Sequence, residues 1–307
     1  MEDTDWQKVI SGVIVKVAML MSRIIGSSIE KEINSEGIVV KIGMKVAGRW
    51  MENEAAPYIS AAVLLAFSKM PVNEDSVSKT LAAADFLPSD RRMLKFAAAL
   101  HFENKLPYAP AVYFLNVVGS EISAEKVSAV VKALRIEPDA GLAGEVISIY
   151  NELESGKTFG AAQERLNESM ARVFEAMSKM LLSELNRLYD IPGFRENVKG
   201  GLLPYLAATG TAYYIGWNIA LNGKDEWKKI LSYLVSAAGL APNMQMISYL
   251  VDSLNLDASP SLIYIAALYF LKSLSKSISI TNLAKVVNSV GIKPDETVGG
   301  FIINTYS

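Results

Sequence analysis

The feature that most constrains this chain is that its sequence repeats itself. Residues Glu121–Asn151 align without a gap on Ser277–Ser307, a shift of 156 positions, and ten of the 31 aligned residues are identical. Two unrelated segments of this length share about two identities at typical residue frequencies. The same shift places apolar residues near the N-terminus on apolar residues of the second half: Ile10, Ile14, Val17, Met21 and Ile25 on Leu166, Met170, Val173, Met177 and Leu181. The sequence therefore predicts two related halves, 1–156 and 157–307.

A shorter unit recurs within each half, marked by a turn that contains proline. The four turns are Leu87-Pro88-Ser89-Asp90, Glu137-Pro138-Asp139, Ala241-Pro242-Asn243 and Lys293-Pro294-Asp295. Proline disfavours helix for the residue before it, and an Asp or Asn after it accepts hydrogen bonds from the free amides that open a helix. Each turn is therefore expected to end one helix and start the next.

The segments around these turns have apolar residues every three or four positions, which is typical of one buried helical face. Val127, Val130, Val131 and Leu134 precede one turn, and Leu142, Val146, Ile149 and Tyr150 follow it. A segment rich in alanine and aromatic residues leads each unit. We predict an all-α fold with four three-helix units, at about 57–106, 107–151, 203–257 and 259–307.

Each half begins with a long amphipathic segment, at 6–30 and at 159–189. The second carries one apolar stripe: Leu166, Met170, Phe174, Met177, Leu181, Leu185 and Leu188. These segments are expected to be helices that dock on their own units, since so many apolar side chains left in water would form a large exposed patch. A coiled-coil or partner-binding helix is the alternative. Residues 37–48 alternate apolar and polar residues, which is typical of a short strand or hairpin.

The second unit contains a run of short motifs at Ala111–Leu115, Gly119–Val127, Val130–Leu134 and Pro138-Asp139, and the last unit, Ile263–Tyr306, is similar. In these residues the chain resembles the helical N-terminal domain of the acidic ribosomal stalk proteins of archaea and eukaryotes. The resemblance implies a small helical domain that dimerises through apolar helices, each dimer gripping one helix of a stalk-base protein. The chain departs from that family at Thr305-Tyr306-Ser307, where no acidic tail follows.

The resemblance leads to a hypothesis for the packing of each half. Units one and two would pair and receive the first leading helix, and units three and four would pair and receive the second. The residues expected in these two contacts are Val9, Ile10, Val13, Val17, Met21 and Ile24 in the first leading helix, and Leu166, Met170, Phe174, Met177 and Leu181 in the second. Each half would then be self-contained, with a joint between the halves at about 152–160.

The composition argues against several classes of function. Thirty basic and 32 acidic residues give a net charge of −2, without the basic excess that nucleic-acid binding requires. There is no cysteine and one histidine, His101, so thiolate chemistry is excluded and a histidine metal site is not expected. Ser155-Gly156-Lys157-Thr158 resembles the end of a phosphate-binding loop, but Asn151 occupies the position where that loop needs glycine. We predict no catalytic, cofactor-binding or metal-binding residues.

Residues 200–223 carry no charge over 24 positions, which is long enough to cross a bilayer. Because this stretch contains five glycines, a proline and polar residues, we expect a buried helix and no membrane span. The acidic start of the chain favours a cytoplasmic protein. Aromatic residues at Tyr213, Tyr214, Trp217, Tyr264, Tyr269 and Phe270 would fill the core or anchor a partner.

The sequence thus favours a non-catalytic helical repeat protein that acts in protein–protein interaction or assembly. Its partner would be another protein or a second copy of itself, and the stalk resemblance points to translation. Two alternatives remain open: an enzyme with a site in the groove between the halves, and a membrane-associated helical protein.

Overall fold

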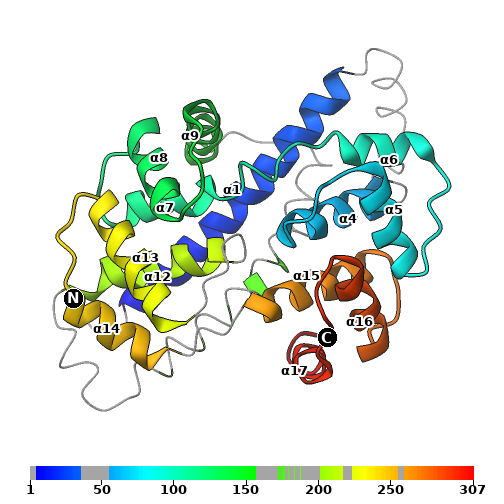
Figure 1. The fold of residues 1–307 in the computed structure, drawn as a ribbon. Helices are drawn as coiled ribbons and strands as arrows, with labels where there is room; N and C mark the ends of the chain where they lie inside the picture. The colour runs from blue at the N-terminus through cyan, green and yellow to red at the C-terminus, as the bar shows by residue number, and fades with distance from the viewer. Residues whose placement is uncertain are drawn as a thin grey trace. The chain divides into compact units, whose positions relative to one another are not determined.

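The structure is a computed structural model that describes residues 5–35, 55–156, 201–216, 223–254 and 259–307, together with positions 172, 173, 175, 176, 179, 183 and 187. In these residues the fold is all-α, with thirteen helices and no strand (Figure 1). The expected all-α class is therefore confirmed. The alternating segment 37–48 lies outside the described residues.

A long helix, α1 (Asp5–Ser35), comes first in the chain. The remaining described helices follow in four successive groups of three. They are α4 (Ala56–Phe67), α5 (Glu74–Ala83) and α6 (Arg91–Ala98); α7 (Tyr108–Val117), α8 (Ala124–Ala133) and α9 (Ala140–Glu154); α12 (Leu202–Gly216), α13 (Lys224–Ala237) and α14 (Met244–Ser253); and α15 (Ser259–Ser273), α16 (Ile280–Ser289) and α17 (Glu296–Tyr306). We call these groups units one to four.

The third helix of every unit begins at the proline turn, as the sequence predicts. Asp139 caps α9 by accepting hydrogen bonds from the backbone N–H groups of Gly141 at 2.7 Å and Leu142 at 3.0 Å. Asn243 and Asp295 cap α14 and α17 in the same way. In unit one the cap is Asp90, two residues after the proline. Such a cap typically stabilises a helix by about 1 kcal/mol relative to alanine.

The second helix of every unit ends in the same turn, with one residue in the left-handed conformation. That residue is Asp85 (φ 53°), Arg135 (φ 59°), Gly239 (φ 81°) or Gly291 (φ 77°). The next residue donates its backbone N–H to a carbonyl five positions earlier, as from Ile136 to Val131 at 3.3 Å and from Ile292 to Val287 at 3.3 Å. This hydrogen bond satisfies a carbonyl that the end of the helix leaves free.

A tyrosine in the first helix of each unit joins that helix to the start of the third. The phenol oxygen accepts a hydrogen bond from the backbone N–H of the capping residue: Tyr58 from Asp90, Tyr108 from Asp139, Tyr205 from Asn243 and Tyr264 from Asp295. The rings of Tyr58, Tyr108 and Tyr264 are no more than 3% exposed, and that of Tyr205 is 8% exposed. Sequence reasoning did not single out this contact.

The helices form two compact bodies that do not follow the two halves of the chain. The first body comprises Met1–Ile24, Asn104–Thr158 and Met170–Ala258, and the second comprises Ile25–Glu103, Phe159–Ser169 and Ser259–Ser307. Units two and three therefore lie in the first body, and units one and four in the second. Each body contains segments from both halves.

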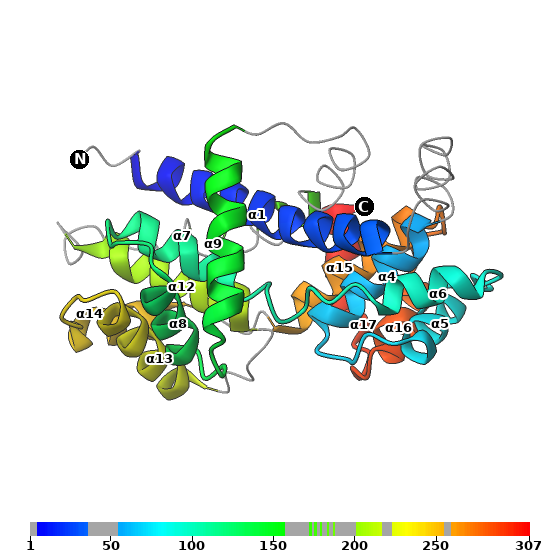
Figure 2. The same ribbon diagram turned by 90° about the horizontal axis from the view of Figure 1, so that it is seen from above.

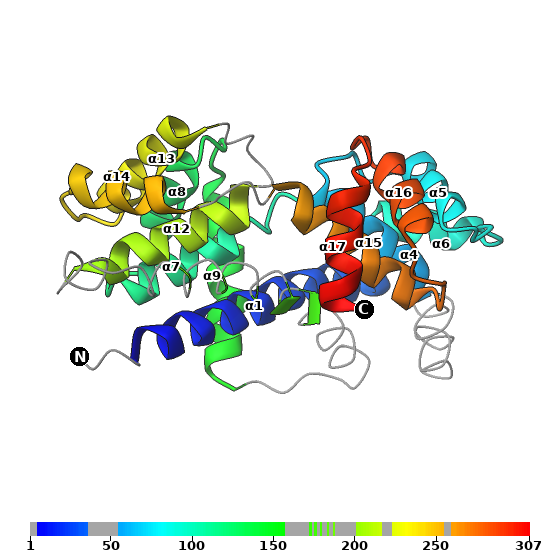
Figure 3. The ribbon, with the colours of Figure 1, turned by 90° about the horizontal axis from the view of Figure 1, so that it is seen from below.

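Within each body the units pair helix by helix. In the first body α7 lies along α12 and α8 along α13, and in the second α4 lies along α15 and α5 along α16 (Figure 3). The expected pairing of unit one with two and of three with four is therefore wrong. Helices α4 and α7 are almost entirely buried, with ten of twelve residues in α4, so each needs a partner helix beyond its own unit. This burial does not select the partner, which depends on specific contacts such as the ion pair of Arg135 with Glu226.

Helix α1 contributes its residues up to Ile24 to the first body and those from Ile25 onward to the second. Many of its apolar residues are buried, including Val17, Met21 and Ile24. Gly12–Ser35 is long and apolar enough to cross a membrane, but 67% of its most apolar window is buried inside the protein, as in the core helix of a soluble protein. The uncharged stretch 200–223 contains α12, whose described length is 15 residues.

Candidate functional site

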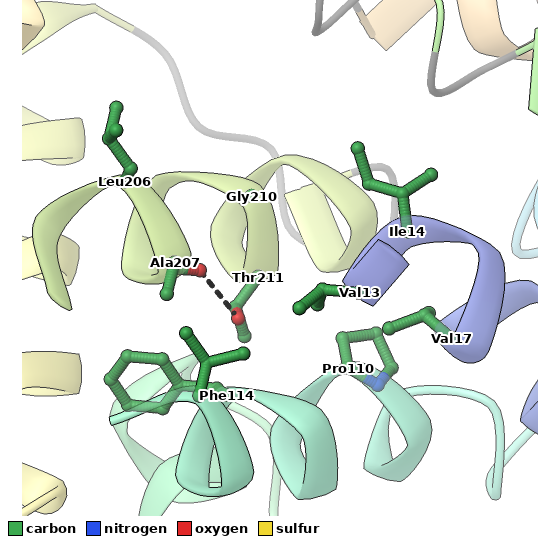
Figure 4. A pocket seen from close by; sticks show the side chains of 10 residues that line it. Val13, Ile14, Val17, Pro110, Phe114, Leu206, Ala207, Gly210 and Thr211 are labelled. Carbon is green, nitrogen blue, oxygen red and sulfur yellow. Dashed lines mark hydrogen bonds between the residues drawn. The ribbon is translucent and has the colours of Figure 1, made fainter. Parts of the chain in front are cut away.

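The candidate functional site is the seam in the first body where α1 lies against α7 and α12. Val13, Ile14 and Val17 of α1 approach Pro110 and Phe114 of α7 and Leu206, Ala207, Gly210 and Thr211 of α12 (Figure 4). Proline is tolerated at Pro110 because it stands in the first turn of α7, where no helical amide is required. The small residues of α12 leave room for a third helix beside α7. The pair formed by α7 and α12 thus holds α1.

The space left in this seam is small and almost entirely apolar. The cavity has a volume of about 30 Å³, whereas small-molecule sites typically have volumes of several hundred Å³. Its one side-chain hydroxyl, on Thr211, donates a hydrogen bond to the carbonyl oxygen of Ala207 at 2.8 Å (Figure 4). Among the described residues, those that line it are not ionisable. This geometry suits the packing of a helix.

Helix α9 crosses α1 and is held to it by two ion pairs (Figure 2). The ammonium of Lys16 lies 3.7 Å from Glu154, and the guanidinium of Arg23 lies 3.7 Å from Glu152. The Lys16 side chain is 50% exposed, so water screens its pair and leaves little net stabilisation. The Arg23 side chain is 7% exposed, and its pair fixes where α9 crosses.

A buried tyrosine connects α7 to the same end of α9. The hydroxyl of Tyr113, which is fully buried, donates a hydrogen bond to Glu154 Oε1 at 3.3 Å. Its ring meets Tyr150 edge to face at 5.3 Å, and the Asn116 amide donates to the Tyr150 hydroxyl at 3.2 Å. Desolvation, strengthened by the nearby Glu154 carboxylate, raises the pKa of both phenols above its ordinary value. At neutral pH the protonated Tyr113 phenol donates to Glu154, whereas the Tyr150 hydroxyl accepts from Asn116.

Sequence reasoning did not identify the residues that fasten α9 to α1. Lys16 and Arg23 interrupt an otherwise apolar segment. A charge inside an apolar helix needs a partner of opposite sign, and the acidic end of α9 supplies it through Glu152 and Glu154. This pairing is the signal in the sequence that could have located the contact.

The residues that were weighed for chemistry lie apart from this seam. His101 is exposed, and its backbone N–H bonds to the carbonyl of Ala99 at 2.9 Å. Gly156 follows the end of α9 and has a φ of 71°. The residues before it form this helix, whereas a phosphate-binding loop follows a strand. Lys157 and Thr158 lie outside the described residues. In the described ranges no group of three or more His, Asp or Glu side chains is placed to hold a metal ion.

The aromatic residues that the sequence offers as core residues or partner anchors differ in their exposure. Tyr264 and Phe270 are 1% and 2% exposed and belong to the core. Tyr269 is partly exposed, and Lys272 Nζ lies 5.1 Å from its ring centroid. The side chains of Tyr213, Tyr214 and Trp217 lie outside the described residues, as do most of those of the second leading segment, of which Val173 and Ala176 are buried.

Comparison of the chain with models of protein families, with curated proteins and with solved structures found no match to any of them.

Proposed function

We propose that this chain is a non-catalytic, cytoplasmic helical repeat protein that acts in protein–protein interaction or assembly. The observation that carries the proposal is the packing of α1 between α7 and α12. In this arrangement two three-helix units pair and their first helices together hold a third, long helix. The contact is apolar: Val13, Ile14 and Val17 of α1 face α7 and α12, and Ile14 and Val17 are no more than 4% exposed.

A helix held by paired helices is a recognised form of protein–protein contact, in which an amphipathic helix places its apolar face in a groove. In this chain the held helix is part of the same polypeptide, which gives it a high effective concentration. An external protein or a second copy would then bind elsewhere on the molecule. A role in translation would follow from the resemblance to the ribosomal stalk domain.

Exposed apolar side chains supply the surfaces to test. Val15 and Met19, four residues apart on α1, are 49% and 44% exposed, and Tyr233 and Met244 in unit three are 51% and 50% exposed. Contiguous apolar patches on a soluble protein often mark interaction sites. Residues four apart on a helix share a face, so Val15 and Met19 form one candidate patch.

The test is affinity purification of the tagged full-length chain from an extract of its own cells, alongside a variant with Val15→Asp and Met19→Asp and a variant with Tyr233→Asp and Met244→Asp. We expect a protein partner, or a second copy, that one of the two double variants loses while its circular dichroism and melting temperature stay at the wild-type values. A chain that elutes without partners, and whose mass by sedimentation is that of a monomer at every concentration, would contradict the proposal.

A further inference from the structure

The pairing of units assigns every described unit in one half a partner in the other half. Unit two, in residues 1–156, pairs with unit three, and unit one pairs with unit four, in residues 157–307. The two units of one half meanwhile belong to different bodies. Neither half therefore contains a complete body.

Polar contacts join the paired units in addition to the apolar helices. In the first body Arg135 Nη1 lies 2.6 Å from Glu226 Oε2, and the Ser120 hydroxyl donates to the carbonyl of Ala238 at 3.3 Å. In the second body Lys285 Nζ lies 3.6 Å from Asp85 Oδ2, and Lys276 Nζ donates to the carbonyl of Asp85 at 2.8 Å. Each of these contacts joins a residue numbered below 157 to one numbered above it.

Burial shows what each half would lose alone. Eight consecutive residues of α7, Tyr108–Leu115, are all buried. In α4, ten of the twelve residues are buried. A helix packed only on its own unit leaves its other side in water. An isolated first half would thus expose two apolar surfaces, one on α4 and α5 and one on α7 and α8.

From these observations we infer that the two halves are interlocked partners, and that the first half has two binding surfaces for a second half, one on α4 and α5 and one on α7 and α8. The second half of the same chain occupies them here. The second half of another copy carries the same complementary helices and fits them equally well. Association of the halves therefore needs no continuous connection between them.

The test uses the full-length chain with a recognition site for a specific protease inserted after Gly156, which is exposed beyond the end of α9. The uncut protein is first required to match the wild type in circular dichroism and melting temperature. After cleavage we expect the two fragments to elute together at the mass of the intact chain, with unchanged helical content. Fragments that separate without denaturant, whether folded or unfolded, would overturn the inference.

A second measurement tests the pairing directly in the wild-type chain. A carbodiimide activates the Asp85 carboxylate, the Lys285 amine attacks it, and an amide bond forms while the reagent leaves as its urea. We expect a cross-linked peptide that joins these two residues, and fragments of the cleavable chain that stay covalently joined in a denaturing gel. The Asp85→Asn variant is the matched control and should lose this cross-link. Absence of the cross-link in the wild type would contradict the pairing of units one and four.

The role of a second copy is tested with two batches of cleaved protein, one of which carries a tag on its first half. The batches are mixed in denaturant and refolded together. We expect the tag to retrieve untagged second halves from the other batch, because the binding surfaces do not distinguish the copies. Refolding that returns no pairs of fragments would overturn the inference.

Discussion

At the scale of single residues, four units of different sequence use the same few contacts. A tyrosine, a capping Asp or Asn, and a residue with positive φ recur at corresponding positions, although the surrounding residues differ. At the end of the second helix, two units place glycine in the left-handed position and two place Asp85 or Arg135 there. A side chain in this conformation costs about 1 kcal/mol relative to glycine, so these two units carry some strain.

The glycine that follows α7 allows this strain to be measured. Gly119 has a φ of 68°, and a Cβ added there would meet no atom within 4 Å. We expect Gly119→Ala to lower the free energy of unfolding by about 1 kcal/mol through the backbone alone. The matched variant is Gly144→Ala, inside α9, where the added Cβ also meets no atom. It should raise stability by up to about 1 kcal/mol, because alanine favours helix over glycine.

Denaturant unfolding of both variants checks this pair of predictions. Equal effects of the same sign at the two positions would show that the left-handed conformation after α7 does not control the energy.

The buried tyrosines predict a dependence of stability on high pH. Burial raises the pKa of Tyr113, so the folded protein keeps this proton at a pH where the unfolded chain loses it. Stability from this group is complete below the ordinary tyrosine pKa of about 10 and is lost as pH rises above it. We expect the free energy of unfolding to fall as pH rises above about 10, and to fall less in Tyr113→Phe.

Urea unfolding at a series of pH values measures this slope. Tyr233→Phe, whose ring is half-exposed, is the control and should follow the wild-type curve. An unchanged slope in Tyr113→Phe would show that this phenol does not contribute.

At the scale of elements, the central feature is a long helix held by the first helices of two units. Helix α1 is rich in apolar residues, and its ion pairs Lys16–Glu154 and Arg23–Glu152 are both with α9 of unit two. The apolar contact supplies the stabilisation, while the ion pair at Arg23 fixes the crossing point. The hypothesis that units one and two would pair and receive the first leading helix is wrong, since Val13, Ile14 and Val17 of α1 lie against units two and three.

Two methionines of α1 separate packing from surface effects. Met21 is fully buried and Met19 is 44% exposed, and they lie two positions apart on the same helix. We expect Met21→Asp to lower the free energy of unfolding by about 3 kcal/mol, since a charge without a partner would enter an apolar contact. Met19→Asp should change the free energy of unfolding by less than about 0.5 kcal/mol.

Thermal unfolding of the two variants provides the measurement. A large loss in both would mean that the exposed face of α1 is also packed in solution. The corresponding substitution in the second leading segment, Met177→Asp, concerns a side chain outside the described residues.

At the scale of the whole molecule, the two bodies are each assembled from distant parts of the chain. A defect in one unit should therefore weaken its partner in the other half more than its neighbour in the same half. Phe114 of α7 and Phe67 of α4 are each 1% exposed and occupy the first helices of units two and one.

Replacing each phenylalanine by alanine should cost about 3 kcal/mol. We expect Phe114→Ala to speed hydrogen exchange in α12–α14 and to leave α4–α6 unchanged, and Phe67→Ala to speed exchange in α15–α17 and to leave α7–α9 unchanged. Mass spectrometry of exchanged peptides resolves these segments. Faster exchange in the other unit of the same half, without change in the partner unit, would contradict the pairing.

The sequence by itself determined the local structure of this protein. The 3.6-residue spacing of apolar residues predicts the helices, and the proline turns predict where α9, α14 and α17 begin, because capping depends on residues only a few positions apart. Single residues in apolar helices were harder to interpret. Nothing local indicates that Arg23 reaches Glu152 or that Tyr108 reaches Asp139, since these contacts join residues distant in the sequence.

The choice of partner for each unit was decided only by the tertiary structure. Because the four units present similar apolar first helices, the pattern of α7 is compatible with α4, α12 or α15 as its neighbour. The hydrophobic effect is not directional and does not select among them. The selection depends on how the helices fit side by side, on contacts such as Arg135 with Glu226, and on which units the long helix α1 can reach at once. These are properties of the folded chain. They pair the units of one half with those of the other, whereas the repeat alone predicted that each half would be self-contained.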